Sequence, residues 1–178
     1  MSLALLGVAS VSVQAVDSYH QSPPNEVLMK GPTVLQKERM GSSCWNYYNY
    51  YTSKEEGGGW ASLCADTGYT FPRRAVLLEV GSRPHLRINK PQRPERVRIV
   101  AYKDFDRNKA RPIGEGHRLD ITLRRVEREG ETVAWDVYLG VNRPDSHYYL
   151  DTWIVWERVP GTRTSSGDLP KSFHLKTR

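Results

Sequence analysis

The chain has 178 residues, of which 38% are hydrophobic and 26% are charged, and its formal net charge at pH 7 is +6. This composition is that of a soluble globular protein, and it excludes a disordered chain and a membrane protein. The length fits one domain that can bury a core of its own.

The N-terminal segment 1–15 is an apolar run that ends in the small-residue pattern Val13-Gln14-Ala15. It has the length of the apolar part of a signal peptide and is too short to span a bilayer. We therefore expect a signal peptide over 1–15, a single domain over 16–178, no transmembrane helix and a secreted or extracytoplasmic location. The basic residues that usually open a signal peptide are missing, so a folded N-terminal strand is the alternative. No cysteine follows the run, and a lipid anchor is not expected.

The two cysteines of the chain, Cys44 and Cys64, are 20 positions apart. In an exported protein such a pair predicts one disulfide bond, which would close the loop 44–64. In the chain-entropy model this closure stabilises the fold by roughly 3 kcal/mol. Free thiols are the alternative. A metal site is less favoured, because two cysteines without a near histidine cannot complete a tetrahedral set.

The loop 44–64 is rich in aromatic residues and contains the glycine run Gly57–Gly59. Aromatic rings stack on sugar rings and on apolar or cationic ligands. Alternatively, some of these rings could form a lid over an open end of the fold, or a strand over 46–52. We expect Trp45 to pack in the core beside the disulfide. The candidate ligand-binding residues are Tyr47, Tyr48, Tyr50, Tyr51 and Trp60.

Outside this loop, apolar and polar residues alternate in short runs bounded by Gly, Pro, Asn and Asp, which is typical of half-buried strands. The segment 128–131 has the character of a hairpin turn. The run 148–156 is apolar on both faces and should be a central strand, with Trp135, Trp153 and Trp156 in the core. The pattern predicts an all-β, immunoglobulin-like β-sandwich of seven or eight strands with one disulfide-closed loop. Strands are expected near 33–37, 75–80, 86–88, 97–101, 119–123, 133–139, 148–156 and 171–176.

Positive charge is concentrated between Arg83 and Arg111, where the chain has ten Lys or Arg and three Asp or Glu. Such a patch can bind polyanions, for example phosphate-bearing wall polymers. The alternative is a solvated strand face that binds nothing. The candidate polyanion-binding residues are Arg87, Arg96 and Arg98.

Catalytic motifs are not found in the sequence. It has no nucleophile elbow, no phosphate-binding glycine loop and no His-Glu-x-x-His, and its five histidines lack ligand spacing. Asp104, Asp106, Asn108 and Glu115 have calcium-loop spacing, but Lys109 stands where that loop needs glycine. We therefore expect no catalytic residues, no metal, no cofactor and no enzymatic activity.

Three stretches carry a resemblance to a loosely defined group of uncharacterised exported proteins and lipoproteins of Gram-positive and related bacteria. They are Gly41–Trp45 together with Cys64–Asp66, the arginine- and proline-rich strands after Gly81, and Tyr148–Trp156 followed by Gly167–Asp168 and Ser172–Phe173. The resemblance implies a β-sandwich with a Cys–Cys loop near its first strand, and it implies no catalytic role.

These observations together favour an exported, non-catalytic binding or structural module of the cell envelope, which binds carbohydrate or wall polymer through the aromatic loop. One alternative is a protein-interaction module that presents the disulfide loop to a protein partner, as some inhibitors do. Another is a hydrolase that acts on the envelope. Nucleic acid is an unlikely partner, because aromatic and arginine residues do not interleave as in RNA-binding motifs.

Overall fold

The computed structural model describes residues 23–37, 39–40, 43–49, 59–66, 70–158 and 164–178. Within these ranges the chain forms fifteen β-strands and no helix, so the all-β prediction is confirmed. None of these residues therefore belongs to a helix that could cross a membrane. The expected signal peptide over 1–15 lies outside the described residues.

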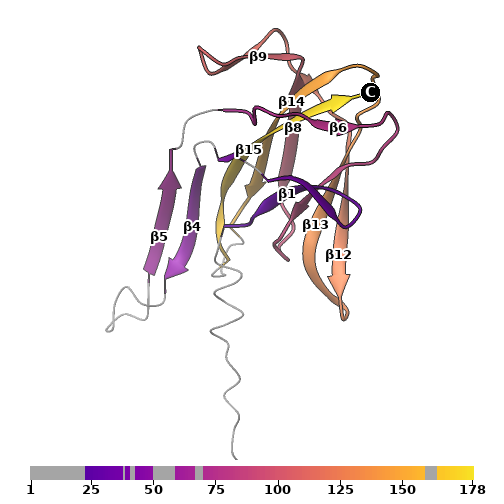
Figure 1. The fold of residues 1–178 in the computed structure, drawn as a ribbon. Helices are drawn as coiled ribbons and strands as arrows, with labels where there is room; N and C mark the ends of the chain where they lie inside the picture. The colour runs from indigo at the N-terminus through magenta and orange to yellow at the C-terminus, as the bar shows by residue number, and fades with distance from the viewer. Residues whose placement is uncertain (1–22, 38, 41–42, 50–58, 67–69, 159–163) are drawn as a thin grey trace, which may run out of the picture.

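Most strands belong to two mainly antiparallel sheets, which we call the small sheet and the large sheet (Figure 1). The small sheet has the order β12 (Ile121–Arg128), β13 (Glu131–Leu139), β7 (His85–Ile88), β1 (Glu26–Lys30) and β2 (Thr33–Lys37). The large sheet has the order β11 (His117–Arg118), β8 (Arg96–Tyr102), β14 (His147–Trp156), β15 (Ser166–Thr177), β4 (Ser43–Asn49) and β5 (Gly59–Ala65). β9 (Asp104–Asp106) and β10 (Arg111–Ile113) form a separate hairpin.

The twelve-residue strand β15 organises the large sheet. On one side it pairs with β14 over ten residues. On the other side its first residues pair with β4, its middle with β3 (Arg39–Met40), and its last residues run parallel to β6 (Val76–Leu78). β14 lies between β8 and β15, so the prediction that 148–156 is a central strand is confirmed.

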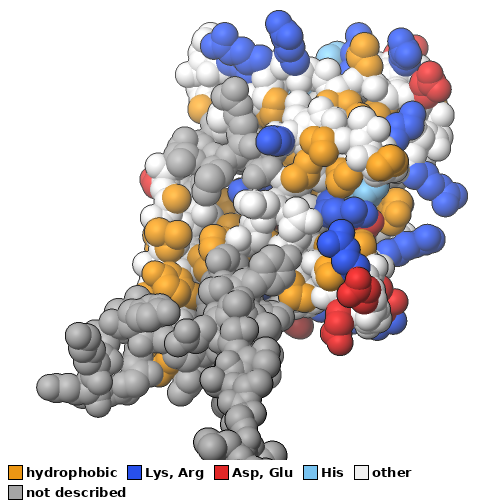
Figure 2. Space-filling model, turned by 60° about the horizontal axis from the view of Figure 1, so that its bottom comes forward, with side chains coloured by type: hydrophobic (Ala, Val, Ile, Leu, Met, Phe, Trp, Pro, Cys, Tyr) orange, Lys and Arg blue, Asp and Glu red, His pale blue; other side chains and the backbone are white. Residues whose placement is uncertain are grey.

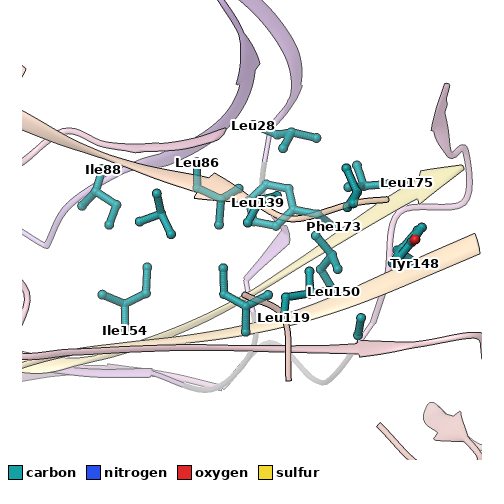
Figure 3. Close-up of a cluster of buried hydrophobic side chains, with 14 of the residues drawn as sticks. Leu28, Leu86, Ile88, Leu119, Leu139, Tyr148, Leu150, Ile154, Phe173 and Leu175 are labelled. Atoms are coloured by element: carbon teal, nitrogen blue, oxygen red, sulfur yellow. The ribbon is translucent and has the colours of Figure 1, made fainter. Parts of the chain in front are cut away.

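The core lies between the two sheets, as in a sandwich. Figure 3 shows Leu86 and Ile88 of the small sheet facing Leu150 and Ile154 of the large sheet, and all four side chains are fully buried. Burying each such side chain stabilises the fold by about 1.5–3 kcal/mol. The alternation seen in the sequence therefore places one face of each sheet in this core. The opposite face is not open everywhere, because Ser172 and His174 of β15 are also buried and are hydrogen-bonded to the backbone oxygens of Thr70 and Pro72. The immunoglobulin-like topology stays a prediction.

Hairpin chemistry matches the sequence at the β12–β13 turn. Glu129 and Gly130 both have positive φ, 54° and 85°. Two-residue hairpin turns whose twist matches that of the flanking strands require positive φ at both central residues. The predicted turn at 128–131 is thereby confirmed.

Two elements differ from the sequence-based expectation. β1 was not expected, because its five residues follow a proline-rich lead and carry a charge at each end. β15 begins at Ser166, within a stretch whose glycine and proline favoured a loop, because β4 and β14 both pair with this segment. The number of strands in the described ranges is accordingly larger than seven or eight.

Candidate functional site

The disulfide lies in the antiparallel hairpin β4–β5, which forms one edge of the large sheet at the left of Figure 1. Cys44 and Cys64 are directly opposite each other, with an S–S distance of 2.13 Å and Cα atoms 4.1 Å apart. The predicted bond is confirmed. Both cysteines are exposed, so the bond links two paired strands at the surface.

One face of this hairpin packs inward. Trp45 is only 1% exposed and its ring meets that of Trp156 edge-on at 5.5 Å between centroids. The predicted core position of Trp45 is confirmed, but its packing partner is Trp156, since Cys44 points to the opposite side of the strand. Tyr47 also lies on the inward face and contacts the core, which separates it from the other aromatic candidates.

The other face of the hairpin belongs to the outer face of the large sheet. Residues directly opposite on neighbouring strands point to the same side, and here they form three successive pairs. Tyr48 faces Trp60 with the rings edge-on at 5.6 Å, and the hydroxyl of Ser62 donates a hydrogen bond to the side-chain oxygen of Asn46. The third pair is the cystine. Trp60 is 41% exposed and Tyr48 is half-buried, while Tyr50 and Tyr51 lie outside the described residues.

A guanidinium covers part of Trp60. The Cζ atom of Arg158, just beyond β14, lies 4.1 Å from the centroid of the Trp60 ring. A cation at this position is attracted by the electron-rich ring face and holds the indole in place.

The outer face continues from the hairpin onto β15 and β14. Asp168 is opposite Cys44, and its carboxylate accepts hydrogen bonds from the Cys44 backbone N–H at 3.4 Å and from the indole N–H of Trp153 at 3.1 Å. Trp153 is 40% exposed, so its predicted core position is wrong. The physical reason is alternation along β14, which sends Ile154 and Trp156 inward and Trp153 outward.

The arginines of β8 border this aromatic surface. Arg98 is directly opposite Trp153, and Arg96 is opposite Val155. Arg96 also forms an exposed ion pair with Glu157 at 3.0 Å. The structure therefore brings Arg96 and Arg98 onto the same sheet face as Trp60 and Trp153.

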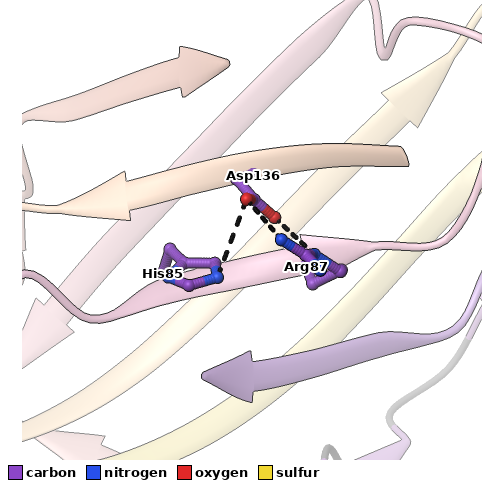
Figure 4. Close-up of polar contacts among 3 residues, drawn as sticks. All are labelled: His85, Arg87 and Asp136. Atoms are coloured by element: carbon purple, nitrogen blue, oxygen red, sulfur yellow. Dashed lines mark hydrogen bonds and ion pairs between the residues drawn. The ribbon is translucent and has the colours of Figure 1, made fainter. Parts of the chain in front are cut away.

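Arg87, the third arginine of the predicted patch, lies on the small sheet. Figure 4 shows that its guanidinium forms a bidentate ion pair with the carboxylate of Asp136, with both N···O distances 2.7 Å. The hydrogen bond to Asp136 raises the pKa of Arg87. His85 lies 3.7 Å from the same carboxylate, and burial lowers the pKa of this histidine. Arg87 is part of a local ion pair and is separated from Arg96 and Arg98.

Lys90 is a buried charged residue that sequence reasoning missed. Lys90 is 1% exposed, donates a hydrogen bond to the hydroxyl of Ser165 at 3.2 Å and lies 5.1 Å from the Trp45 ring centroid. Burial lowers the pKa of Lys90 to about 8. In the sequence, Lys90 belongs to a polar, proline-rich stretch with no sign of burial.

A pair of histidines also comes together on the large sheet. His174 donates from Nδ1 to the carbonyl oxygen of Pro72 at 3.1 Å, so its Nε2 accepts from Nδ1 of His147, also at 3.1 Å. Tyr149 stacks on His174 with 4.1 Å between ring centroids, and burial lowers the pKa of His174. The histidines are 27 positions apart, and no spacing in the sequence links them.

In the described part of the chain, no three or more His, Cys, Asp or Glu side chains come together as metal ligands. Asp106, part of the calcium-loop spacing, accepts hydrogen bonds from the backbone N–H groups of Asn108 and Lys109, which shapes the β9–β10 turn.

A surface pocket of about 490 Å³ lies on the small sheet between Ser82, Arg124 and Tyr138, away from the exposed tryptophans.

Comparison with known proteins gives no relative: no protein-family model, no curated protein and no solved structure matches the chain.

Proposed function

We propose that the chain is an exported, non-catalytic binding module of the cell envelope with an immunoglobulin-like β-sandwich fold, and that the outer face of its large sheet binds a carbohydrate wall polymer. The observation that carries this proposal is the presence of two exposed indole rings, Trp60 and Trp153, on one continuous sheet face bordered by Arg96 and Arg98. The exposed disulfide and the signal peptide expected over 1–15 support an extracytoplasmic location.

The spacing of the two indoles suits a long ligand. Trp60 and Trp153 are three strands apart across the sheet and six residues apart along it, by the register of β5, β4, β15 and β14. With strands 4.8 Å apart and 3.3 Å per residue, the rings are separated by about 25 Å. This distance corresponds to several sugar residues, so a polymer could contact both rings while a single sugar could not.

The chemistry of the face suits a ligand that has both sugar rings and negative charge. Trp153 is held by the hydrogen bond from its indole N–H to Asp168, which leaves its ring face for stacking. Arg98, directly opposite, can pair with a phosphate or carboxylate of the same ligand. Arg158 covers one face of Trp60, so a sugar would stack on the opposite face of that ring.

Co-sedimentation of the full chain with insoluble peptidoglycan and polysaccharides, at low and high salt, tests the proposal. We expect retention that persists at high salt and that Trp153→Ala and Trp60→Ala each weaken by about tenfold, the effect of losing one stacking contact of 1.4 kcal/mol. Val34→Ala on the small sheet is the control, because Val34 is also an exposed apolar side chain, 53% exposed, but lies on the other sheet. Retention that neither tryptophan variant changes would contradict the proposal.

The salt dependence of retention distinguishes binding by the tryptophans from binding by the arginines. If high salt alone abolishes retention, the arginines carry the binding and Arg98→Ala should reproduce the loss. A second candidate function, presentation of the hairpin to a protein partner, is favoured by the position of β4 and β5 at the edge of the large sheet (Figure 1). Absence of retention on every polymer would favour this second candidate.

A further inference from the structure

The strand orders of the two sheets end in four edge strands, and three of these are protected against pairing with another chain. Within the described ranges, β3 and β6, of two and three residues, pair only with β15 and are too short to offer a long edge. β12 carries Arg124, Arg125, Glu127 and Arg128, and its pairing shifts register between Val126 and Glu127. β11 is only two residues long and includes Arg118. Charges, bulges and short length are the usual means by which proteins prevent unwanted strand pairing.

The third protected edge, β2, is covered by other parts of the chain. The side chain of its Gln36 donates to the backbone carbonyl of Arg74 at 3.1 Å and accepts from the backbone N–H of His174 at 3.0 Å. β2 also ends in Lys37. A further strand could not approach this edge without breaking these bonds.

β5 has none of these protections. Its seven residues, Gly59–Ala65, contain no charged residue and no proline, and Leu63 is 56% exposed. Among the described residues, no strand pairs with the side of β5 that faces away from β4. In Figure 2, Lys and Arg side chains gather on the upper and right-hand parts, whereas the visible left flank, where β4 and β5 lie, shows apolar side chains.

The backbone of β5 is oriented to bind another strand. Opposite residues in an antiparallel pair have Cα atoms about 4.5 Å apart when they exchange no hydrogen bonds and about 5.5 Å apart when they do. The 4.1 Å between the Cα atoms of Cys44 and Cys64 identifies a pair without hydrogen bonds. The N–H and C=O groups of Cys64, and by alternation those of Ser62 and Trp60, therefore point away from β4, toward the unpaired side.

We propose that β5 pairs antiparallel with β5 of a second copy of this chain, about a two-fold axis at Ser62. In this register Ser62 lies opposite Ser62 of the second copy, and Trp60 lies opposite Cys64. These pairs use the outward backbone groups identified above, and each pair exchanges two hydrogen bonds. A shift by one residue would set outward groups against inward ones, and a shift by two would leave fewer pairs.

The side chains of β5 complement themselves in this register. Ala61 and Leu63 share the inward face, and the register sets the small Ala61 opposite the large Leu63 of the second copy. On the outer face, the Trp60 ring lies beside the cystine of the second copy. The strand has no charge that its copy would repel, which a self-complementary two-fold interface requires. This dimer would join two large sheets into one, and it is independent of whether their outer face binds a polymer.

The test places matched charges on the axis and measures the mass of the full chain by sedimentation. The native protein should be a dimer that dissociates on dilution. Ser62→Lys and Ser62→Glu should each weaken the dimer by about tenfold or more, because like charges then lie directly opposite each other. An equimolar mixture of the two variants should restore the dimer. Thr122→Lys, an exposed site on the edge strand β12, is the control and should leave the dimer intact.

Amide hydrogen exchange gives a second readout that does not depend on a variant. The N–H groups of Trp60 and Ser62 should exchange fast in dilute protein and slowly in concentrated protein, while those of Ala61 and Leu63 exchange slowly in both. A monomer at all concentrations would overturn the proposal. So would a dimer that Ser62→Lys leaves unchanged, or slow exchange of Trp60 and Ser62 in the dilute monomer, which would mean that the chain covers this edge itself.

Discussion

Removal of the disulfide should lower stability by an amount that follows from its position. Cys44 and Cys64 close a loop with a sequence separation of 20, for which the chain-entropy model gives about 3 kcal/mol. Both cysteines are exposed, so replacing them by alanine opens no buried cavity and adds little to this value. For a domain of this size, 1 kcal/mol corresponds to about 2–4 °C in Tm. We expect the double variant Cys44→Ala/Cys64→Ala to melt about 6–12 °C below the native protein.

Thermal unfolding followed by circular dichroism, with and without a reducing agent, measures this difference. The reductant should lower the Tm of the native protein to that of the double variant and leave the variant itself unchanged, which controls for other effects of the reductant. A double variant that melts at the same temperature as the native protein would refute the reasoning. The ends of the loop would then be held together in the unfolded ensemble by something other than the disulfide.

Three further changes test buried or crowded positions. Because the pKa of Lys90 is lowered to about 8 from the ordinary lysine value of 10.5, the unfolded chain binds more protons than the folded chain between these two pH values. The free energy of unfolding should therefore rise by about 3 kcal/mol as the pH increases across this range. Urea titrations at successive pH values measure this rise, and Lys90→Met should remove it. Arg87→Ala removes the bidentate ion pair of the buried Asp136 carboxylate and should lower the free energy of unfolding in urea by about 2–3 kcal/mol. Arg96→Ala breaks an exposed ion pair and should lower it by less than about 1 kcal/mol. Equal losses for the two variants would contradict this reasoning. Gly167→Ala would place a new Cβ against the backbone of β4 and should lower the free energy of unfolding by about 1–3 kcal/mol in the same assay. An unchanged free energy of unfolding would mean that β4 and β15 separate more easily than the structure indicates.

Most of the strands were predictable because each is marked by a pattern in its own sequence. Alternation of apolar and polar residues is a property of a few consecutive residues, and it correctly indicated β8, β12, β13 and β14. β1 left a weaker trace, since Glu26 at its start is fully buried and so contradicts the usual pattern. The start of β15 was hidden because its pairing partners, not its own residues, make it a strand.

The candidate site was predictable only in part. Trp60 and Tyr48 are near in sequence to the cysteines that place them, so the aromatic loop could be identified. Trp153 reads as a core residue, because an isolated strand does not reveal which of its faces meets the second sheet. Arg87 and Arg98 read as one patch, because the sheet that each strand joins depends on pairing with residues far away in the chain.

The position of β15 bears on how the protein acquires its structure while it is being made. β15 is synthesised after every other described strand, yet it separates β14 from β4 in the large sheet. Until residues 166–177 have emerged, β14 lacks one neighbour and the hairpin β4–β5 has no strand to join. If the chain crosses a membrane as an extended polypeptide, this order would keep the large sheet open during passage and let it close only on the far side, where the disulfide can also form.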